Sequence, residues 1–235
     1  MRRDFVSGVS HELKTPLTVI QACTDTLLGG ALDDREAAER FLKQIEEQSE
    51  RLLQLVLGML QLSRVESGAE VFRMEPVCLG ELVTQVFHQL TPLAASGNVE
   101  LICKGDPAIL IRADYRAVET IADNLLSNAI KHSPPGSQVI VSIQPREDAK
   151  VQFSVADSGQ GIAPEFHERI FERFYRVDRD RSRDKGGTGL GLAIVKHLCQ
   201  TMGAAVSVDS AVGRGAVFTV VFDAVEATPS QEQDT

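Results

Sequence analysis

The strongest constraint on the fold is a heptad pattern of apolar residues between positions 41 and 62. Spacings of three and four residues alternate along this segment, which is typical of a helix that packs against other helices over its whole length. The pattern runs through Phe41, Ile45, Gln48, Leu52, Leu55, Met59 and Leu62. Further residues widen the apolar face: Leu42, Leu53, Val56, Leu57 and Leu60. The segment is therefore predicted to be a long helix with a wide apolar surface.

Another long helix is predicted before it, over residues 2–28. Gly29-Gly30 end this helix, because glycine readily takes the left-handed conformation that closes helices. Asp33 with Glu36 resembles a capping box that begins the next helix. Two helices alone cannot bury so wide a surface, so we expect two hairpins to pair into a four-helix bundle and make a homodimer. The alternative is packing of the hairpin onto the downstream part of its own chain.

The first helix is also predicted to present a histidine to solvent. Its apolar residues form one buried stripe through Phe5, Val9, Leu13, Leu17 and Ile20. His11 lies two residues from both Val9 and Leu13, about 160° around the helix from each, so its imidazole points away from the stripe. Glu12 follows directly, and Thr15 lies one turn further on the face of His11. The alternative is an inert helix with an ordinary charged face.

Beyond residue 77 the pattern changes to a mixture of helices and strands. Helices are predicted over 79–95, 115–132 and 190–202, and strands over 99–103, 109–112, 139–143, 151–155, 205–209 and 216–222. This order predicts helices on one face of a mixed sheet, a two-layer α/β sandwich, and the whole chain is of the α+β class. We divide it into a hairpin over 1–67, a linker over 68–76, an α/β domain over 77–224 and a disordered tail over 225–235.

One predicted helix carries a stripe suited to a metal-bound polyphosphate. Asn124, Asn128 and Lys131 are spaced at i, i+4 and i+7, which places them on one face. An amide oxygen can bind Mg²⁺, which prefers hard oxygen ligands, and a lysine can bind a phosphate. An ordinary solvated polar face is the alternative.

Two glycine-containing motifs add to this stripe. Asp157 ends a predicted strand and is followed by Gly159 and Gly161, which offers a carboxylate to an exocyclic amine beside flexible backbone; a tight turn with an Asp cap is the alternative. The run 186–192, Gly-Gly-Thr-Gly-Leu-Gly-Leu, directly precedes a helix, and such an N-terminus binds anions. No strand leads into the run and no βαβ unit surrounds it, so a Rossmann site is rejected.

Together these motifs resemble a known family. Residues 5–17 resemble the H box of sensor histidine kinases with a HisKA-type dimerisation domain. The segments around Asn128, Asp157 and Gly189 resemble the N, G1 and G2 boxes of the GHKL ATPase fold, which these kinases share with gyrase and a heat-shock chaperone. Residues 170–178 resemble the kinases' F box. The chain thus looks like the catalytic core of a histidine kinase of a bacterial two-component system.

This resemblance implies a catalytic role for four residues. His11 would be the phosphoacceptor, which must be neutral to attack, and imidazole's ordinary pKa of about 6.5 makes that form abundant at pH 7. Glu12 would assist removal of its proton. Thr15 would help to orient a water that removes phosphate from the partner. Arg176, at the start of a charge-rich lid over 176–185, would stabilise charge on the transferring phosphoryl group.

The resemblance also implies the cofactors ATP and Mg²⁺. Asn128 would ligate the metal and Asp157 would accept the adenine amine. The other residues implied for the nucleotide pocket are Asn124, Lys131, His132, Gly159, Gly161, Arg173, Tyr175, Gly187, Thr188, Gly189, Leu190 and Gly191. His132 stands where the family often carries an aromatic residue, which puts base stacking there in doubt.

Composition excludes other classes. The net charge of −9 leaves no basic footprint for nucleic acid, and no apolar run approaches the ~20 residues of a membrane span. The four cysteines are scattered without a C-x-x-C pair, so neither a disulfide framework nor a zinc site is indicated. We expect a cytoplasmic fragment that makes no membrane contact, whose longer parent could be anchored in the inner membrane.

The expected partner, besides a second copy of the chain, is the receiver domain of a response regulator, whose aspartate would take the phosphoryl group. One alternative is a GHKL-type ATPase that drives conformational change without phosphotransfer. A dimeric scaffold that binds nucleotide without chemistry is another. Activity dominated by a regulator phosphatase, with Thr15 central, is a third.

Overall fold

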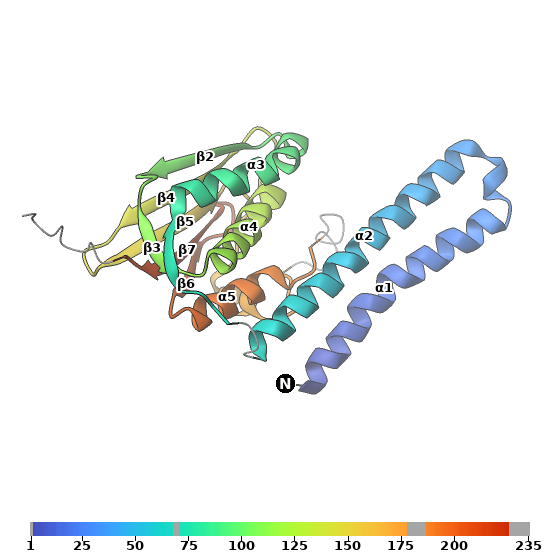
Figure 1. Ribbon diagram of the computed structural model, residues 1–235. Helices are drawn as coiled ribbons and strands as arrows, with labels where there is room; N and C mark the ends of the chain where they lie inside the picture. The colour runs from blue at the N-terminus through green and yellow to red at the C-terminus, as the bar shows by residue number, and fades with distance from the viewer. Residues whose placement is uncertain (1, 68–70, 178–186, 226–235) are drawn as a thin grey trace, which may run out of the picture.

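The described chain consists of a long helical hairpin and an α/β unit (Figure 1). The structure is a computed structural model and describes residues 2–67, 71–177 and 187–225, without the side chains of residues 2–8, 11 and 66. The predicted disordered tail falls almost entirely outside the described residues, as do positions 178–185 of the expected lid. The predicted division into a hairpin followed by an α/β unit is confirmed, while its exact boundaries stay predictions.

The hairpin is formed by α1 (Arg2–Leu28) and α2 (Arg35–Glu66), with the 3₁₀ turn η1 (Ala31–Asp33) between them. The predicted capping box is wrong by one residue. Asp33 lies within η1, and Asp34 is the N-cap of α2, whose side chain accepts a hydrogen bond from the Ala37 N–H. Because η1 occupies the residues up to Asp33, the first side chain that can cap α2 is the next one along.

The α/β unit contains a mixed sheet with helices on one side (Figure 1). Its helices are α3 (Leu79–Gly97), α4 (Tyr115–His132) and α5 (Gly191–Thr201), with 3₁₀ turns η2 (Pro164–Phe166) and η3 (Arg169–Phe171). Its strands are β1 (Glu75–Cys78), β2 (Glu100–Gly105), β3 (Leu110–Ala113), β4 (Gln138–Pro145), β5 (Lys150–Asp157), β6 (Ala205–Ser210) and β7 (Ala216–Asp223). The main sheet has the order β2-β4-β5-β7-β6, in which β2 pairs parallel to β4 and the other pairs are antiparallel.

The core lies between this sheet and the three helices. Alternate residues of the central strands are buried, as the period of two predicts: Val139, Val141, Ile143, Val151, Phe153, Val155, Phe218, Val220 and Phe222. β1 was not expected, since the linker was predicted to run to residue 76. It forms a separate two-stranded sheet with β3, in which Pro76 lies opposite Arg112. A strand at the edge tolerates proline because one of its sides needs no N–H.

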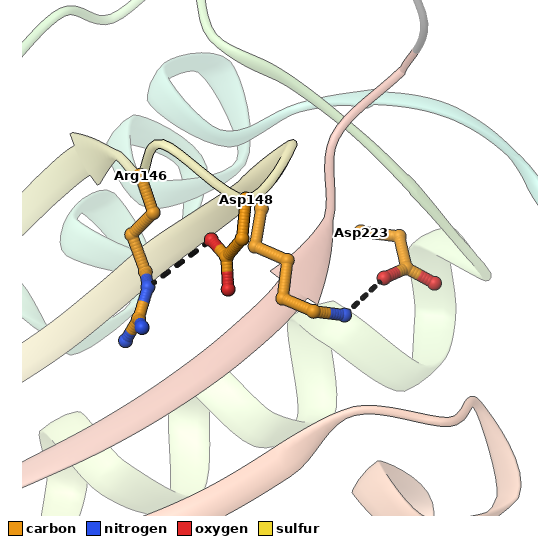
Figure 2. Close-up of polar contacts among 4 residues, drawn as sticks. Arg146, Asp148 and Asp223 are labelled. Atoms are coloured by element: carbon orange, nitrogen blue, oxygen red, sulfur yellow. Dashed lines mark hydrogen bonds and ion pairs between the residues drawn. The ribbon is translucent and has the colours of Figure 1, made fainter.

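Two surface ion pairs mark one end of the sheet. Arg146 pairs with Asp148 at 3.4 Å, and Lys150 donates to Asp223 at 2.7 Å, as Figure 2 shows. The hydrogen bond to Asp223 raises the pKa of Lys150. All four side chains are well exposed, and such pairs contribute little to stability. Because β5 begins at Lys150 and ends at Asp157, these pairs lie at the opposite end of β5 from the candidate nucleotide residues.

The hairpin packs against the α/β unit along one side of α2. Leu55, Leu62 and Val65 are buried in the same apolar core as the sheet. Gln61 donates to the hydroxyl of Thr120 on α4 at 3.3 Å. At Gly58 there is no side chain, and a Cβ there would lie 3.1 Å from Leu190 Cδ1. The alternative of packing onto the downstream domain is therefore correct for this part of the apolar surface.

The rest of the apolar surface of α2 remains open in the single chain. The residues that widen the heptad pattern are 43% to 56% exposed: Leu42, Leu53, Val56, Leu57 and Leu60. On α1, Leu17 is exposed, while Val9, Leu13 and Ile20 are half-buried. The described residues of the predicted stripe of α1 are thus only partly buried within one chain. In the part of the chain that the structure covers, no helix combines the length and apolar character needed to cross a membrane.

Candidate nucleotide-binding site

Helix α4 carries four of the residues predicted for the candidate site. Asp114 caps its first turn by accepting a hydrogen bond from the Ala117 N–H at 3.0 Å. One face is buried in the core and holds the helix in place through Ile121, Leu125, Leu126 and Ala129. Asn124, Asn128 and Lys131 are half-buried on the adjacent face, and His132 is exposed at the end. The predicted polar stripe therefore lies on a fixed helix at the edge of the core.

Asn124 brings α4 against the second glycine motif. Its amide nitrogen donates to the Thr120 carbonyl at 2.8 Å. Its Oδ1 would lie only 2.5 Å from a Cβ at Gly191. Gly191 is the first residue of α5, so the missing side chain allows the start of that helix to approach the middle of α4. The predicted N and G2 motifs thus meet in the structure.

Asp157 holds the first glycine motif at the end of β5. Its Oδ1 accepts hydrogen bonds from the Gly159 N–H at 2.8 Å and the Ala216 N–H at 3.3 Å. A Cβ at Gly159 would lie 2.8 Å from the His132 carbonyl oxygen, so this turn lies against the end of α4. Burial raises the pKa of Asp157, and the two backbone hydrogen bonds oppose that shift. The other carboxyl oxygen accepts no hydrogen bond from the described residues and can accept one from a ligand.

A second loop, between β6 and β7, supports this turn, a contact that was not predicted from the sequence. The Ser210 hydroxyl accepts from the Ile162 N–H at 2.9 Å and donates to the Gly215 carbonyl at 2.6 Å. Gly213 N–H donates to the Gln160 carbonyl at 2.6 Å. A Cβ at Gly161 would overlap the carbonyl oxygen of Ala211. The two loops are therefore packed backbone to backbone, which holds the turn after Asp157 in place.

Replacement of Gly215 by Ala should test this packing. Gly213 and Gly215 have φ values of 81° and 73°, so alanine is strained at either, by about 1 kcal/mol. A Cβ at Gly215 would in addition overlap the Asp157 carbonyl oxygen, whereas nothing lies within 4 Å of one at Gly213. We expect Gly213→Ala to lower the free energy of unfolding by about 1 kcal/mol and Gly215→Ala by about 3 kcal/mol or more. Thermal unfolding would measure both; equal losses would contradict the close packing.

The segment before the expected lid is tied to the segment after it. Phe174 N–H donates to the Gly189 carbonyl at 2.8 Å. Phe174 has a φ of 59° and Gly189 one of 70°, and a Cβ at Gly189 would lie 2.9 Å from Phe174 Cα. Glycine at 189 is therefore required both by conformation and by space. The F and G2 motifs are joined at this point.

The other predicted residues of these motifs lie around that junction. Tyr175 is half-buried, with its ring 4.4 Å from the Arg169 guanidinium carbon and 6.3 Å from the ring of Phe166. Arg173 is exposed and Arg176 is half-buried. Gly187 and Thr188 are half-buried, and the Leu190 N–H donates to the Thr188 hydroxyl at 3.4 Å. Leu190 is fully buried against Gly58, and its carbonyl accepts a hydrogen bond from the Ile194 N–H at 2.9 Å.

The predicted phosphoacceptor region lies on α1. The side chain of His11 is outside the described residues, so its outward orientation stays a prediction. Glu12 is half-buried and pairs with Arg51 of α2 at 3.5 Å. Thr15 is half-buried on the next turn. Sequence reasoning did not identify Arg51, because it lies 39 positions from Glu12.

The residues present fit a magnesium ion carried by a nucleotide. Asn128 is half-buried one turn beyond Asn124, and no side-chain hydrogen bond to a described residue occupies its amide. Among the described residues there is no group of three or more His, Cys, Asp or Glu that could hold a metal by itself. A single amide oxygen suits Mg²⁺, which keeps most of its ligands as waters and phosphate oxygens.

The fold and this site define a GHKL-type ATP-binding unit joined to a helical hairpin. Residues 1–68 match the family model of the His Kinase A (phospho-acceptor) domain. Residues 113–226 match that of the histidine kinase-, DNA gyrase B- and HSP90-like ATPases.

Comparison of nearly the whole chain with known proteins also finds histidine kinases. Over 233 residues the chain is 38% identical to the sensor-like histidine kinase SenX3 of Mycobacterium tuberculosis, a match that covers 99% of this chain and 56% of that protein. It is 37% identical to the sensor histidine kinase WalK of Bacillus subtilis, over 93% of this chain and 36% of that one. The chain belongs to the sensor histidine kinase family. It spans about half the length, or less, of these relatives.

Solved structures agree with the fold. The chain superimposes on full-length ShkA, determined with AMPPNP, with a TM-score of 0.68 and 32% identity, covering 95% of this chain and 46% of that one. The histidine kinase ThkA, solved with the response regulator protein TrrA, gives a TM-score of 0.76 over 93% of this chain and 60% of that one. Its identity of 23% supports the fold alone. The expected fold class is thus confirmed, and a Rossmann arrangement is excluded.

Proposed function

We propose that this chain transfers the γ-phosphoryl group of ATP to His11 and then passes it to an aspartate of a response regulator. The observation that carries this proposal is the convergence of two glycine loops on one helix. α4 contacts the first loop through the His132 carbonyl at Gly159 and the second through Asn124 at Gly191. Asn128 and Lys131 lie on that helix and Asp157 holds the first loop, in a chain whose hairpin matches a phospho-acceptor domain.

In this proposal the chain's own residues bind and orient the nucleotide. Asp157 accepts the exocyclic amine of adenine, and the rigid turn beside it admits the flat base. Asn124, Lys131 and backbone N–H groups within residues 187–191 hold the phosphates, since the start of a helix carries N–H donors without intrahelical partners and a positive dipole end. Asn128 would hold Mg²⁺, which neutralises charge on the phosphates when bound. Arg173, Tyr175 and Arg176 border the phosphate end.

The transfer step itself involves His11 and Glu12. A bond forms between a ring nitrogen of His11 and the γ-phosphorus while the bond from that phosphorus to the bridging oxygen breaks, and ADP leaves. Glu12 accepts the proton that the imidazole loses. Arg176 stabilises negative charge on the transferring group. In the second step the phosphoryl group moves from His11 to a receiver aspartate.

Incubation with γ-labelled ATP tests this function against the ATPase alternative. Acid-labile, base-stable label on the protein is expected, because a phosphorus–nitrogen bond resists base. Steady release of phosphate without label on the protein would overturn the proposal in favour of an ATPase. The match of residues 1–68 to a phospho-acceptor domain favours the kinase.

The same proposal includes a homodimer formed through the hairpin. The exposed apolar residues of α2 form a surface that one chain leaves uncovered, and a second hairpin would bury it in a four-helix bundle. The proposal places the fragment in the cytoplasm, where receiver domains are found, without contact to nucleic acid or membrane. A parent protein anchored in the inner membrane is consistent with relatives that are named sensor kinases.

We also propose that the chain removes phosphate from the regulator, with Thr15 orienting the attacking water. Thr15→Ala should then slow dephosphorylation of the phosphorylated regulator about 10-fold, while labelling of His11 changes less than twofold. Thr18 lies three residues further along the same helix and is exposed, so Thr18→Ala is the matched control. Release of phosphate from the regulator measures the effect. An unchanged rate for Thr15→Ala would remove Thr15 from this role.

A further inference from the structure

The ion pair between Glu12 and Arg51 differs from the other ion pairs among the described residues. It joins the two helices of the hairpin, and only 10% of the Arg51 side chain and 25% of the Glu12 side chain are exposed. The other pairs lie on the surface within one helix or at the end of the sheet. Glu12 directly follows His11, so this half-buried pair lies one residue from the proposed phosphoacceptor.

Stability alone does not account for Arg51. A guanidinium that leaves water must regain its hydrogen bonds, and a buried pair with incomplete partners often destabilises a fold. Arg51 Nε is buried and has no hydrogen-bond partner in the described part of the chain. The distance of 3.5 Å from Nη2 to Glu12 Oε2 is long for a charge-assisted bond. Replacing such a pair by apolar side chains of similar volume is often neutral or stabilising.

A proton acceptor beside His11 does need such a partner. Successive side chains on a helix point about 100° apart, so helix geometry alone does not direct the Glu12 carboxylate toward the His11 ring. A free glutamate also samples many rotamers. Arg51 binds Oε2 and restricts the side chain, while Oε1 has no hydrogen bond to a described residue and stays available as an acceptor.

We propose that Arg51 is a positioning residue for the phosphotransfer reaction. It holds the Glu12 carboxylate in the orientation in which the carboxylate accepts the proton that His11 loses. Arg51 lies on the hairpin, binds across to α1, and is not among the residues assigned to the nucleotide pocket. This inference rests on the proposed function and assigns to α2 a part of the reaction that begins on α1.

Initial rates of labelling at varied ATP concentration test this role. Arg51→Gln should lower kcat by 10- to 100-fold and leave KM for ATP within twofold, because the nucleotide residues are untouched. Arg51→Lys keeps a cation within reach of Glu12 and should recover at least part of the rate. Arg40→Gln, which removes an exposed arginine from the same helix, should label at the normal rate. A merely structural role would not separate kcat from KM or respond to lysine.

A double-mutant cycle with Glu12→Gln makes the test independent of folding losses. If Arg51 acts through Glu12, Arg51→Gln in the Glu12→Gln background should change kcat less than twofold. Additive losses, or a full rate for Arg51→Gln with wild-type Glu12, would overturn the inference. Failure of the proposed function looks different: the wild-type chain would then take no label at all.

Discussion

A His11→Gln variant is expected to accept no detectable label from γ-labelled ATP. Glutamine is uncharged and similar in length, but its amide nitrogen is not a nucleophile, so no phosphorus–nitrogen bond can form. His11 belongs to α1 of the hairpin and not to the α/β unit, so nucleotide binding should stay within twofold of wild type. Acid-labile label after gel separation, together with nucleotide binding measured by calorimetry, would show both effects.

The other histidines of the chain provide the control for this variant. His88 lies exposed on α3, away from the hairpin, and His88→Gln should label at the wild-type rate. Retention of full label by His11→Gln would exclude His11 as the acceptor. Mixing His11→Gln with a nucleotide-binding variant would further show whether one chain phosphorylates another: label in the mixture requires transfer between copies.

Asp157→Asn should weaken nucleotide binding by about 100-fold while the fold is preserved. The replacing amide keeps an oxygen that can accept from the Gly159 and Ala216 N–H groups, as Oδ1 does now. Its nitrogen, however, is a donor in the place of the carboxylate oxygen that faces the ligand. A donor opposite the adenine amine loses a charge-assisted hydrogen bond, a loss of about 1.5–3 kcal/mol. The nucleotide-induced rise in unfolding temperature should therefore largely disappear.

The same variant should not destabilise the nucleotide-free protein at neutral pH. Burial raises the pKa of Asp157 above its value in the unfolded chain. The stability that such a group contributes is present at low pH and is lost as the pH rises through the folded pKa. At pH 7 the buried carboxylate thus opposes folding, and its removal should leave the unfolding temperature equal or higher. Asp209→Asn, at an exposed position of β6, is the control for charge. A large fall in unfolding temperature for Asp157→Asn alone would contradict this account.

Local patterns predicted much of the α/β unit. The bounds of α4 match the prediction because the helix is strongly amphipathic, starts after a capping aspartate and ends before Pro134-Pro135. The predicted strands over 139–143 and 151–155 are confirmed within β4 and β5, since period-two alternation directly reports which residues face the core. The nucleotide motifs could be predicted because they are defined by residue types at fixed spacings, which the sequence shows directly.

Features that depend on distant residues could not be predicted in this way. The strand β1 is defined by its pairing with β3, and its proline argued against a strand. The contact of Ser210 with the first glycine loop joins residues 48 positions apart. The Glu12–Arg51 pair and the approach of Leu190 to Gly58 likewise depend on how the hairpin sits in space. The wide apolar surface of α2 could be covered by the α/β unit or by a second hairpin. The sequence alone could not show which residues of α2 serve which contact.

The approach of Leu190 to Gly58 links motion of the hairpin to the shape of the phosphate loop. Leu190 lies between Gly189 and Gly191, and its fully buried side chain packs closely against α2 at Gly58, where a Cβ would lie 3.1 Å from Leu190 Cδ1. Rotation of α2 by one residue position, about 100°, would present Leu57 or Met59 to Leu190 instead. The loop would then have to shift or the hairpin to separate from it. A rotation of α2 would in this way alter the backbone that carries Gly189 and Gly191, which the proposed function assigns to the nucleotide.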